Sequence, residues 1–137
     1  MVQRDIIQEQ IEQLGRVLGK ILAQFLALKL DGDPANAVLL TQEELRGQLK
    51  LNLKKFMELD EAAAIAYADE LGLTGEHLDQ LADYAWRAAE AQPERRTEHL
   101  RTARRLLTFA ELRSDTVTFE RIFLKDRIDT ALRAMAD

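Results

Sequence analysis

Residues 2–30 read VQRDIIQEQIEQLGRVLGKILAQFLALKL, and the apolar pattern of this segment predicts the helix on which the rest of the chain assembles. Its large apolar residues recur at alternating steps of four and three, which is the a/d spacing of a coiled coil held over about three heptads. At about 1.5 Å per residue, the spacing predicts a helix of roughly 40 Å on which the remaining helices assemble. The seam consists of Ile7, Ile11, Leu14, Leu18, Ile21, Phe25 and Leu28.

The apolar face of this helix is wider in its C-terminal half. Val17, Leu22 and Leu26 flank the seam there, so a single partner helix cannot cover it. We expect the other helices to cover this half, and the N-terminal half to pair with a second copy of the chain. The predicted oligomer interface is the narrow seam of Ile7, Ile11 and Leu14, flanked by the uncharged Gln3, Gln10 and Gln13. The alternative is a monomer whose first helix packs wholly on its own domain.

The composition indicates a single all-helical domain. The chain has 137 residues, enough to bury about two thirds of its unfolded surface, with only two prolines and six glycines. It has no cysteine, which excludes a disulfide scaffold, thiolate metal sites and thiol catalysis. Acidic residues interrupt any secretory signal, and the longest uncharged run of the first helix, Ile21 to Leu28, is far below the ~20 residues of a membrane span. We therefore expect a cytoplasmic protein that does not enter membranes.

Capping residues divide the rest of the chain. Asp31-Gly32 ends the first helix, and Asp33-Pro34 starts the second, with the aspartate as N-cap and the proline at the first helical position. A capping box of Thr41 and Glu44 is an alternative start. The loops are short, so we expect five or six helices packed as antiparallel αα-hairpins. The predicted ranges are 34–51, 61–71, 75–91, 94–113 and a last helix from 119, with 51–60 as a partly buried connection.

Further caps define the later helices. Asp60, Thr74 and Thr118 are the predicted N-caps, and Gly72 is the predicted end of the helix over 61–71. The last helix is expected to bury all of its large apolar residues: Phe119, Ile122, Phe123, Ile128, Leu132 and Met135.

One stretch matches the second helix of a tetratricopeptide unit. Ala82, Trp86, Ala89 and Pro93 follow its spacing closely, whereas the first helix of such a unit has no counterpart upstream. A tetratricopeptide-like packing of hairpins is therefore an alternative to an irregular bundle.

The N-terminal stretch Gln3-Arg4-Asp5-Ile6-Ile7, followed by Gln10-Ile11-Glu12-Gln13-Leu14, resembles the opening of small, uncharacterised bacterial helical proteins. The turn at Ser114-Asp115-Thr116-Val117 is similar to one near the end of such proteins. The resemblance implies a bacterial, cytoplasmic helical domain and assigns no functional residue.

The sequence offers no catalytic or metal-binding motif. Neither His77 nor His99 has a ligand residue three or four positions away, so both are interpreted as histidines at the edge of the solvent-exposed surface. Asp31 and Asp33 are explained by helix capping better than by a calcium loop. Gly15 and Gly19 lie mid-helix and indicate a close approach of another helix. We expect no metal or organic cofactor.

Charge is unevenly distributed along the chain, whose net charge is −5. Residues 56–86 contain eight acids and no lysine or arginine, which indicates a solvated acidic face or a patch for a basic partner. The candidate binding surface is formed by Arg101, Arg104 and Arg105, which are predicted to point outward. Interleaved glutamates and the acidic total make nucleic-acid binding unlikely and favour a solvated face.

These observations favour a non-catalytic protein–protein interaction module that self-associates through its first helix, with no other partner identified. One alternative is a small enzyme or ligand-binding bundle, with carboxylates gathered around Tyr67, Tyr84 or Trp86. A weaker alternative is a regulator that contacts nucleic acid through the arginines. A deep pocket of buried carboxylates would favour the enzyme, and a grooved apolar surface would favour the interaction module.

Overall fold

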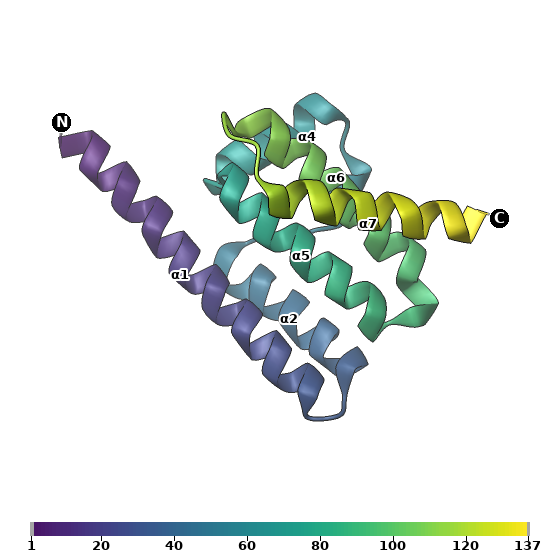
Figure 1. Ribbon diagram of the computed structural model, residues 1–137. Helices are drawn as coiled ribbons and strands as arrows, with labels where there is room; N and C mark the ends of the chain where they lie inside the picture. The colour runs from purple at the N-terminus through teal and green to yellow at the C-terminus, as the bar shows by residue number, and fades with distance from the viewer. Residues whose placement is uncertain (1, 137) are drawn as a thin grey trace.

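The computed structural model describes the backbone of residues 2–136 and the side chains from Ile7 to Ala136. Throughout this part of the chain the regular structure is helical, which confirms the predicted all-α class (Figure 1). The elements are α1 (Val2–Leu30), α2 (Pro34–Leu49), α3 (Lys55–Glu58), α4 (Glu61–Leu71), α5 (Gly75–Ala91), the 3₁₀ turn η1 (Pro93–Arg95), α6 (Arg96–Arg113) and α7 (Phe119–Ala136). The described residues thus form seven α-helices, where five or six were predicted.

The long first helix has the predicted bounds, and α2 follows it after a tight turn. The Asp33 carboxylate caps α2 by accepting a hydrogen bond from the Asn36 N–H at 3.3 Å. The alternative start at Thr41 is wrong, because Thr41 is buried within α2 and its hydroxyl donates to the Ala37 carbonyl at 2.7 Å. Helix α2 ends at Leu49, two residues earlier than predicted, where Lys50 adopts a left-handed conformation with a φ of 56°.

The segment over 51–60 is more ordered and more deeply buried than the predicted connection. It contains the short helix α3, and Leu51 and Phe56 are fully buried. The Phe56 ring packs against the rings of Tyr67 and Phe109. The Tyr67 hydroxyl accepts a hydrogen bond from the Asn52 N–H at 3.0 Å, so α4 holds this segment in place. Packing against two aromatic rings, Tyr67 of the following helix α4 and Phe109 of the distant helix α6 (Arg96–Arg113), orders the segment.

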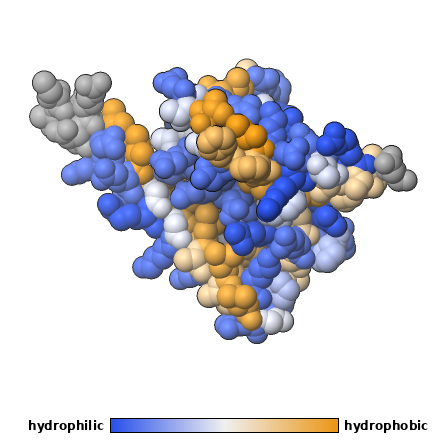
Figure 2. Space-filling model, viewed as in Figure 1, coloured by the Kyte–Doolittle hydropathy of each residue, from blue (hydrophilic) through white to orange (hydrophobic). Residues whose placement is uncertain are grey.

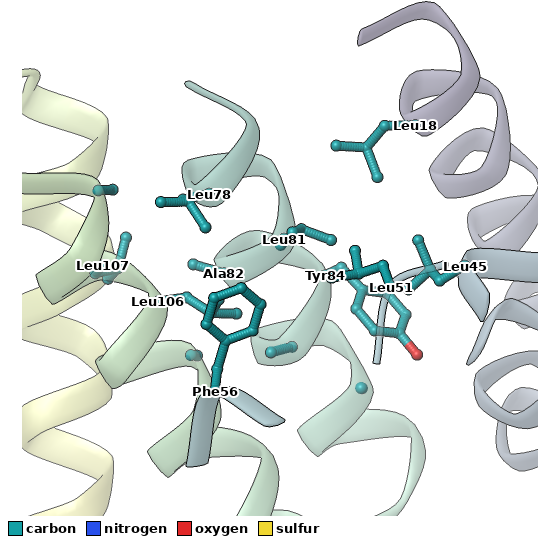
Figure 3. Packing of buried hydrophobic residues seen from close by; sticks show 14 of the residues in the cluster. Leu18, Leu45, Leu51, Phe56, Leu78, Leu81, Ala82, Tyr84, Leu106 and Leu107 are labelled. Atoms are coloured by element: carbon teal, nitrogen blue, oxygen red, sulfur yellow. The ribbon is translucent and has the colours of Figure 1, made fainter. Parts of the chain in front are cut away.

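Helix α5 is the centre of the domain. Its bounds, its Thr74 N-cap and the preceding Asp60 and Gly72 caps agree with the prediction. It packs most extensively against α6 and also contacts α1, α2 and α7 (Figure 1). Leu78, Leu81 and Ala82 of α5 lie between the apolar side chains of α6 on one side and those of α1 and α2 on the other (Figure 3).

The predicted burial of α7 is wrong for most of its residues. Phe119, Ile122, Phe123 and Met135 are exposed, and Ile128 is the only large apolar side chain of α7 that is fully buried. At about 100° per residue, Phe119, Ile122 and Phe123 lie on the face of α7 opposite Ile128 and Leu132. One face of a helix packs on α6, so the two sets cannot both be buried. The Thr118 cap is confirmed, since its hydroxyl accepts a hydrogen bond from the Arg121 N–H at 3.2 Å.

The two halves of α1 have different surroundings. In the C-terminal half, Leu18, Ile21 and Phe25 are fully buried against the domain. The N-terminal half extends beyond the other helices, as Figure 1 shows. Exposure of the seam rises toward this end, from the half-buried Leu14 and Ile11 to Ile7, which is 55% exposed. The seam of α1 is therefore continuous in sequence but covered only in part.

Candidate functional site

An open groove of about 1080 Å³ runs between α1, α5 and α7. One wall is the C-terminal half of α1, the floor is α5 and the other wall is the first half of α7. Figure 2 shows apolar surface between α1 and α5 and at the start of α7. The apolar side chains that line the groove are those of Leu22, Ala23, Leu26, Trp86, Leu107, Phe123 and Leu124.

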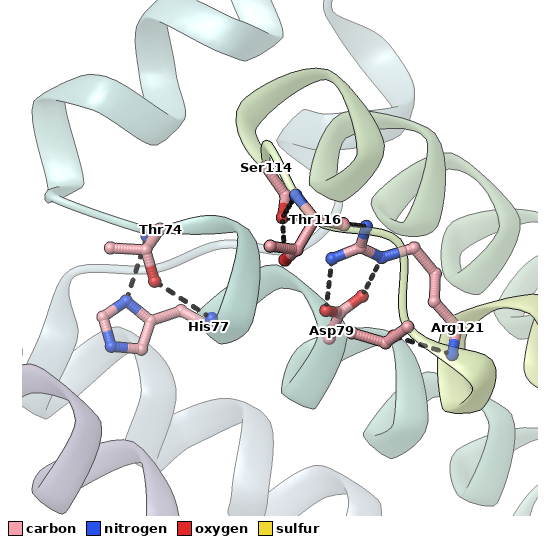
Figure 4. A network of polar contacts seen from close by, with 7 residues as sticks. Thr74, His77, Asp79, Ser114, Thr116 and Arg121 are labelled. Atoms are coloured by element: carbon pink, nitrogen blue, oxygen red, sulfur yellow. Dashed lines mark hydrogen bonds and ion pairs between the residues drawn. The ribbon is translucent and has the colours of Figure 1, made fainter.

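An ion pair fixes α7 as a wall of this groove. The Arg121 guanidinium donates two hydrogen bonds to the Asp79 carboxylate of α5, at 2.9 and 2.7 Å, and a third to the Thr116 carbonyl at 3.1 Å (Figure 4). The Arg121 side chain is 4% exposed, and the hydrogen bond to Asp79 raises the pKa of Arg121 above its usual range. Bidentate pairing keeps this buried cation charged and orients the first turn of α7.

Two further ion pairs border the groove. Arg87 donates to Asp83 at 3.0 Å, and Lys29 of α1 donates to Glu90 of α5 at 3.2 Å. The groove is therefore a largely apolar surface on which three of the four bordering carboxylates are neutralised, and Glu120 and Arg127 also line it. Among the described residues, it holds no histidine and no pair of free carboxylates that could exchange a proton with a substrate.

The exposed face of α7 extends the apolar surface beyond the groove. Phe119 is 78% exposed, Phe123 is 65% exposed, and Val117 and Ile122 are also exposed. Two neighbouring phenylalanines on the open face of a helix cost solubility and gain nothing for the core, because α7 is held by its opposite face. A contiguous apolar surface of this kind is typical of an interaction site.

The predicted oligomer interface lies next to this groove, in the N-terminal half of α1. Ile7 is exposed, while Ile11 and Leu14 are half-buried, and Leu14 packs against the edge of the core. Of the flanking glutamines, Gln10 and Gln13 are exposed, and Gln3 lies outside the described side chains. The seam is thus free to contact a partner over its first two turns, and it meets its own domain at Leu14.

The predicted arginine surface is wrong for two of its three residues. Arg101 is exposed, but Arg104 and Arg105 are half-buried. The Arg104 Nε donates to Asp129 of α7 at 2.7 Å, and the Arg105 Nη2 donates to the Leu59 carbonyl at 2.6 Å. Helix α7 and the segment over 51–60 cover these arginines, and neither contact is visible from the spacing within α6. The candidate surface is thus mainly part of the scaffold.

Both histidines are buried, which corrects their placement at the solvent edge. The His77 Nδ1 accepts a hydrogen bond from the Thr74 N–H at 3.0 Å, and the His77 N–H donates to the Thr74 hydroxyl at 3.3 Å, which closes a capping box at the start of α5 (Figure 4). The His99 Nε2 lies 2.7 Å from the Gln92 Oε1. Burial lowers the pKa of both histidines. Their roles are structural.

The glycines of α1 differ in their surroundings. A Cβ on Gly15 would lie 3.4 Å from the His77 Nε2, so this glycine admits the histidine ring, which agrees with a close approach of α5. A Cβ on Gly19 would meet no atom within 4 Å, and Gly19 lines the groove. The predicted close approach at Gly19 therefore has no partner within the described chain.

The aromatic residues proposed for an enzyme pocket do not converge. Tyr84 is buried against the Phe25 ring, with its hydroxyl 3.4 Å from the Val38 carbonyl, and burial raises its pKa. Tyr67 packs on the segment over 51–60, and Trp86 faces the groove. No three histidine or acidic side chains among the described residues are placed to share a metal ion.

Comparison with known proteins gave no relative: no family model, no curated protein and no solved structure matches this chain. Among the described helices, none is sufficiently long and apolar to span a membrane.

Proposed function

We propose that this protein is a non-catalytic interaction module that binds an apolar helical segment in the groove between α1, α5 and α7. The observation that carries the proposal is the combination of an open apolar groove with side chains exposed at its α7 wall, Phe123 above all. Helix-in-groove recognition uses such a surface: residues at i, i+3 or i+4 and i+7 of the ligand helix enter an apolar groove between helices.

The charges of the groove support binding over catalysis. Asp79, Asp83 and Glu90 each accept a hydrogen bond from a cation of the same chain, so their negative charge is already compensated. These three carboxylates are thus engaged by cations of their own chain and are not directed at a ligand in the groove. A groove bordered by these ion-paired carboxylates instead suits a ligand helix that is apolar and carries few charges.

The cellular context is part of the same proposal. The N-terminal resemblance favours a bacterial cytoplasm, and the pairing of Arg104 and Arg105 disfavours nucleic acid as a partner. A tetratricopeptide-like use of the hairpins stays a prediction.

Photo-cross-linking tests the proposed groove. Phe123→p-benzoylphenylalanine places a photoreactive group in the α7 wall, and Leu39→p-benzoylphenylalanine is the matched control, since Leu39 is 50% exposed on α2 and lies away from the groove. After irradiation in the cells that make the protein, we expect adducts from position 123 and few from position 39. The peptide joined to position 123 should carry apolar residues at helical spacing. Equal labelling from both positions, or attachment to a segment without that spacing, would contradict the proposal.

A further inference from the structure

One wall of the groove is the C-terminal half of α1, and the N-terminal half of the same helix extends beyond the other helices of the chain. We propose that the ligand of the groove is the N-terminal half of α1 from a second copy of this chain, so that two α1 helices pair antiparallel and each fills the groove of the other. This inference rests on the proposed function and names the partner.

The lengths match. The floor of the groove extends along α5 from Asp79 to Glu90, about 17 Å at 1.5 Å per residue. The projecting part of α1, from Val2 to Leu14, is about 18–20 Å long by the same rise. Its seam residues Ile7, Ile11 and Leu14 have the i, i+4, i+7 spacing that a groove between helices accepts.

The chemistry of the two surfaces also matches. The groove is largely apolar and three of its four carboxylates, those of Asp79, Asp83 and Glu90, are paired, so it favours a segment flanked by uncharged polar side chains. The exposed glutamines Gln10 and Gln13 border the seam of α1. Ile7, 55% exposed in the single chain, would be buried in the pair.

Gly19 gives an independent reason for a close approach at this wall. Glycine weakens a helix interior by about 1 kcal/mol relative to alanine, and no described atom lies within 4 Å of the position that a Cβ of residue 19 would take. In an antiparallel pair that brings Ile7 opposite Leu26, Ile11 lies opposite Leu22 and Leu14 lies opposite Gly19. The Leu14 side chain of one copy then lies against Gly19 of the other copy, which has no side chain.

Two-fold symmetry makes this arrangement a closed dimer. A two-fold axis perpendicular to the two helices exchanges the N-terminal half of one α1 with that of the other, so the same pair of surfaces is used twice. Both projecting halves are covered at once and no apolar end remains to extend the assembly. A parallel coiled coil of the two seams would instead leave both grooves open.

Oligomeric state is the first test. Light scattering at micromolar concentration should give twice the mass of the 15.6 kDa chain. Ile7→Glu should give the mass of one chain with unchanged helical circular dichroism, because Ile7 is largely exposed in the single chain. Gln24→Glu, on an exposed position of α1 outside the groove, should stay dimeric. Gly19→Leu should also be monomeric, because it adds a large side chain to the wall at a position where a Cβ meets no described atom within 4 Å.

Trp86 reports on the groove itself, because it is the only tryptophan of the chain and lines the groove. Ile7→Glu should shift its emission to longer wavelength and increase its quenching by acrylamide, whereas Gln24→Glu should change neither. A dimer lost in Ile7→Glu without any change at Trp86 would place the interface elsewhere and overturn the inference.

Disulfide trapping separates the two directions of pairing, and the chain has no cysteine of its own to interfere. Ile7→Cys combined with Leu26→Cys cannot close within one chain, since the two positions are about 28 Å apart along one helix. Oxidation should therefore give covalent dimers of this double variant, and few from Ile7→Cys or Leu26→Cys alone. Efficient cross-linking of Ile7→Cys alone would indicate a parallel seam and contradict the inference.

A parent chain that is monomeric at every concentration would also overturn this inference, but not the proposed function. In that case the adducts from position 123 still decide whether another helix occupies the groove. Conversely, a dimer in which Phe123 forms no adduct with residues 2–14 of the partner would overturn this inference, and the lack of an adduct with any apolar helical segment would contradict the proposed function as well.

Discussion

At the scale of single residues, two glycines differ in how much space the fold leaves for a side chain. Gly19 has no atom within 4 Å of the position of a Cβ, whereas a Cβ on Gly75 would lie 3.1 Å from both the Ala110 carbonyl oxygen and the Ser114 Cβ. Gly75, at the start of α5, is therefore needed for the contact of α5 with the end of α6. No contact within the described chain requires a glycine at position 19.

These two glycines should respond oppositely to the same change. In the Ile7→Glu background, Gly19→Ala should raise the free energy of unfolding by up to about 1 kcal/mol, because alanine restricts the unfolded chain and favours the helix. Gly75→Ala should lower it, because backbone and side chain must move apart. Urea unfolding followed by circular dichroism measures both. A stabilised Gly75→Ala would show that the contact with α6 is looser than described.

At the scale of elements, α7 is the helix whose orientation matters most for the site. It packs on α6 through Ile128 and Leu132 and presents Phe119 and Phe123 to the solvent. Both faces are apolar in sequence, so hydrophobic periodicity alone does not distinguish them.

Substitutions on the two faces of α7 test its orientation. Ile128→Ala should cost about 2–4 kcal/mol, since it leaves a cavity beside α6. Phe119→Ser should change the free energy of unfolding by less than about 0.5 kcal/mol, because Phe119 is 78% exposed. Chemical denaturation gives both values. If Phe119→Ser proved as costly as Ile128→Ala, the exposed face would belong to the core.

The ion pair between α5 and α7 should be sensitive to loss of one partner. Asp79→Asn removes the carboxylate and leaves the Arg121 guanidinium buried with an uncompensated charge. We expect a loss of about 2–4 kcal/mol, measured by urea unfolding. Asp83→Asn is the matched control: its pair with Arg87 is exposed, so the loss should stay below about 1 kcal/mol. Similar losses for the two variants would argue against a special role for Arg121.

At the scale of the whole molecule, charges distant in sequence neutralise each other. The acidic block over 56–86 is paired in part with arginines of the same chain: Asp69 with Arg113, Asp79 with Arg121 and Asp83 with Arg87. The block is thus less available to a basic partner than its sequence indicates.

The stability of the whole domain should fall on acidification below neutral pH. Burial lowers the pKa of His77 and of His99 in the folded chain, so the unfolded chain binds more protons. The resulting stabilisation is fully present above the unfolded value of about 6.5 and is lost as the pH falls below it. Urea midpoints at pH 7.5 and at pH 5.5 measure this loss. It should be smaller in His77→Asn, whose amide oxygen can still accept from the Thr74 N–H; an unchanged loss would exclude His77 as a contributor.

The helical class, the long α1, and the bounds of α4 and α5 follow from the sequence alone. These depend on residues close in sequence: the capping side chains of Asp33, Asp60 and Thr74, the glycine at Gly72 and the heptad spacing of α1. A cap contacts backbone groups within its own first turn, so short sequence segments contain the information.

Three-dimensional packing was needed to establish which apolar face of α7 is buried, where Arg104 and Arg105 point, and that α1, α5 and α7 enclose a groove. Of the candidate site, the sequence identified the seam of Ile7, Ile11 and Leu14 but not the groove or the exposure of Phe123. A helix with two apolar faces satisfies the same periodicity in either orientation. The choice is made by partners distant in the chain, such as Asp79 for Arg121 and Leu59 for Arg105, whose positions follow from the packing of all the helices together.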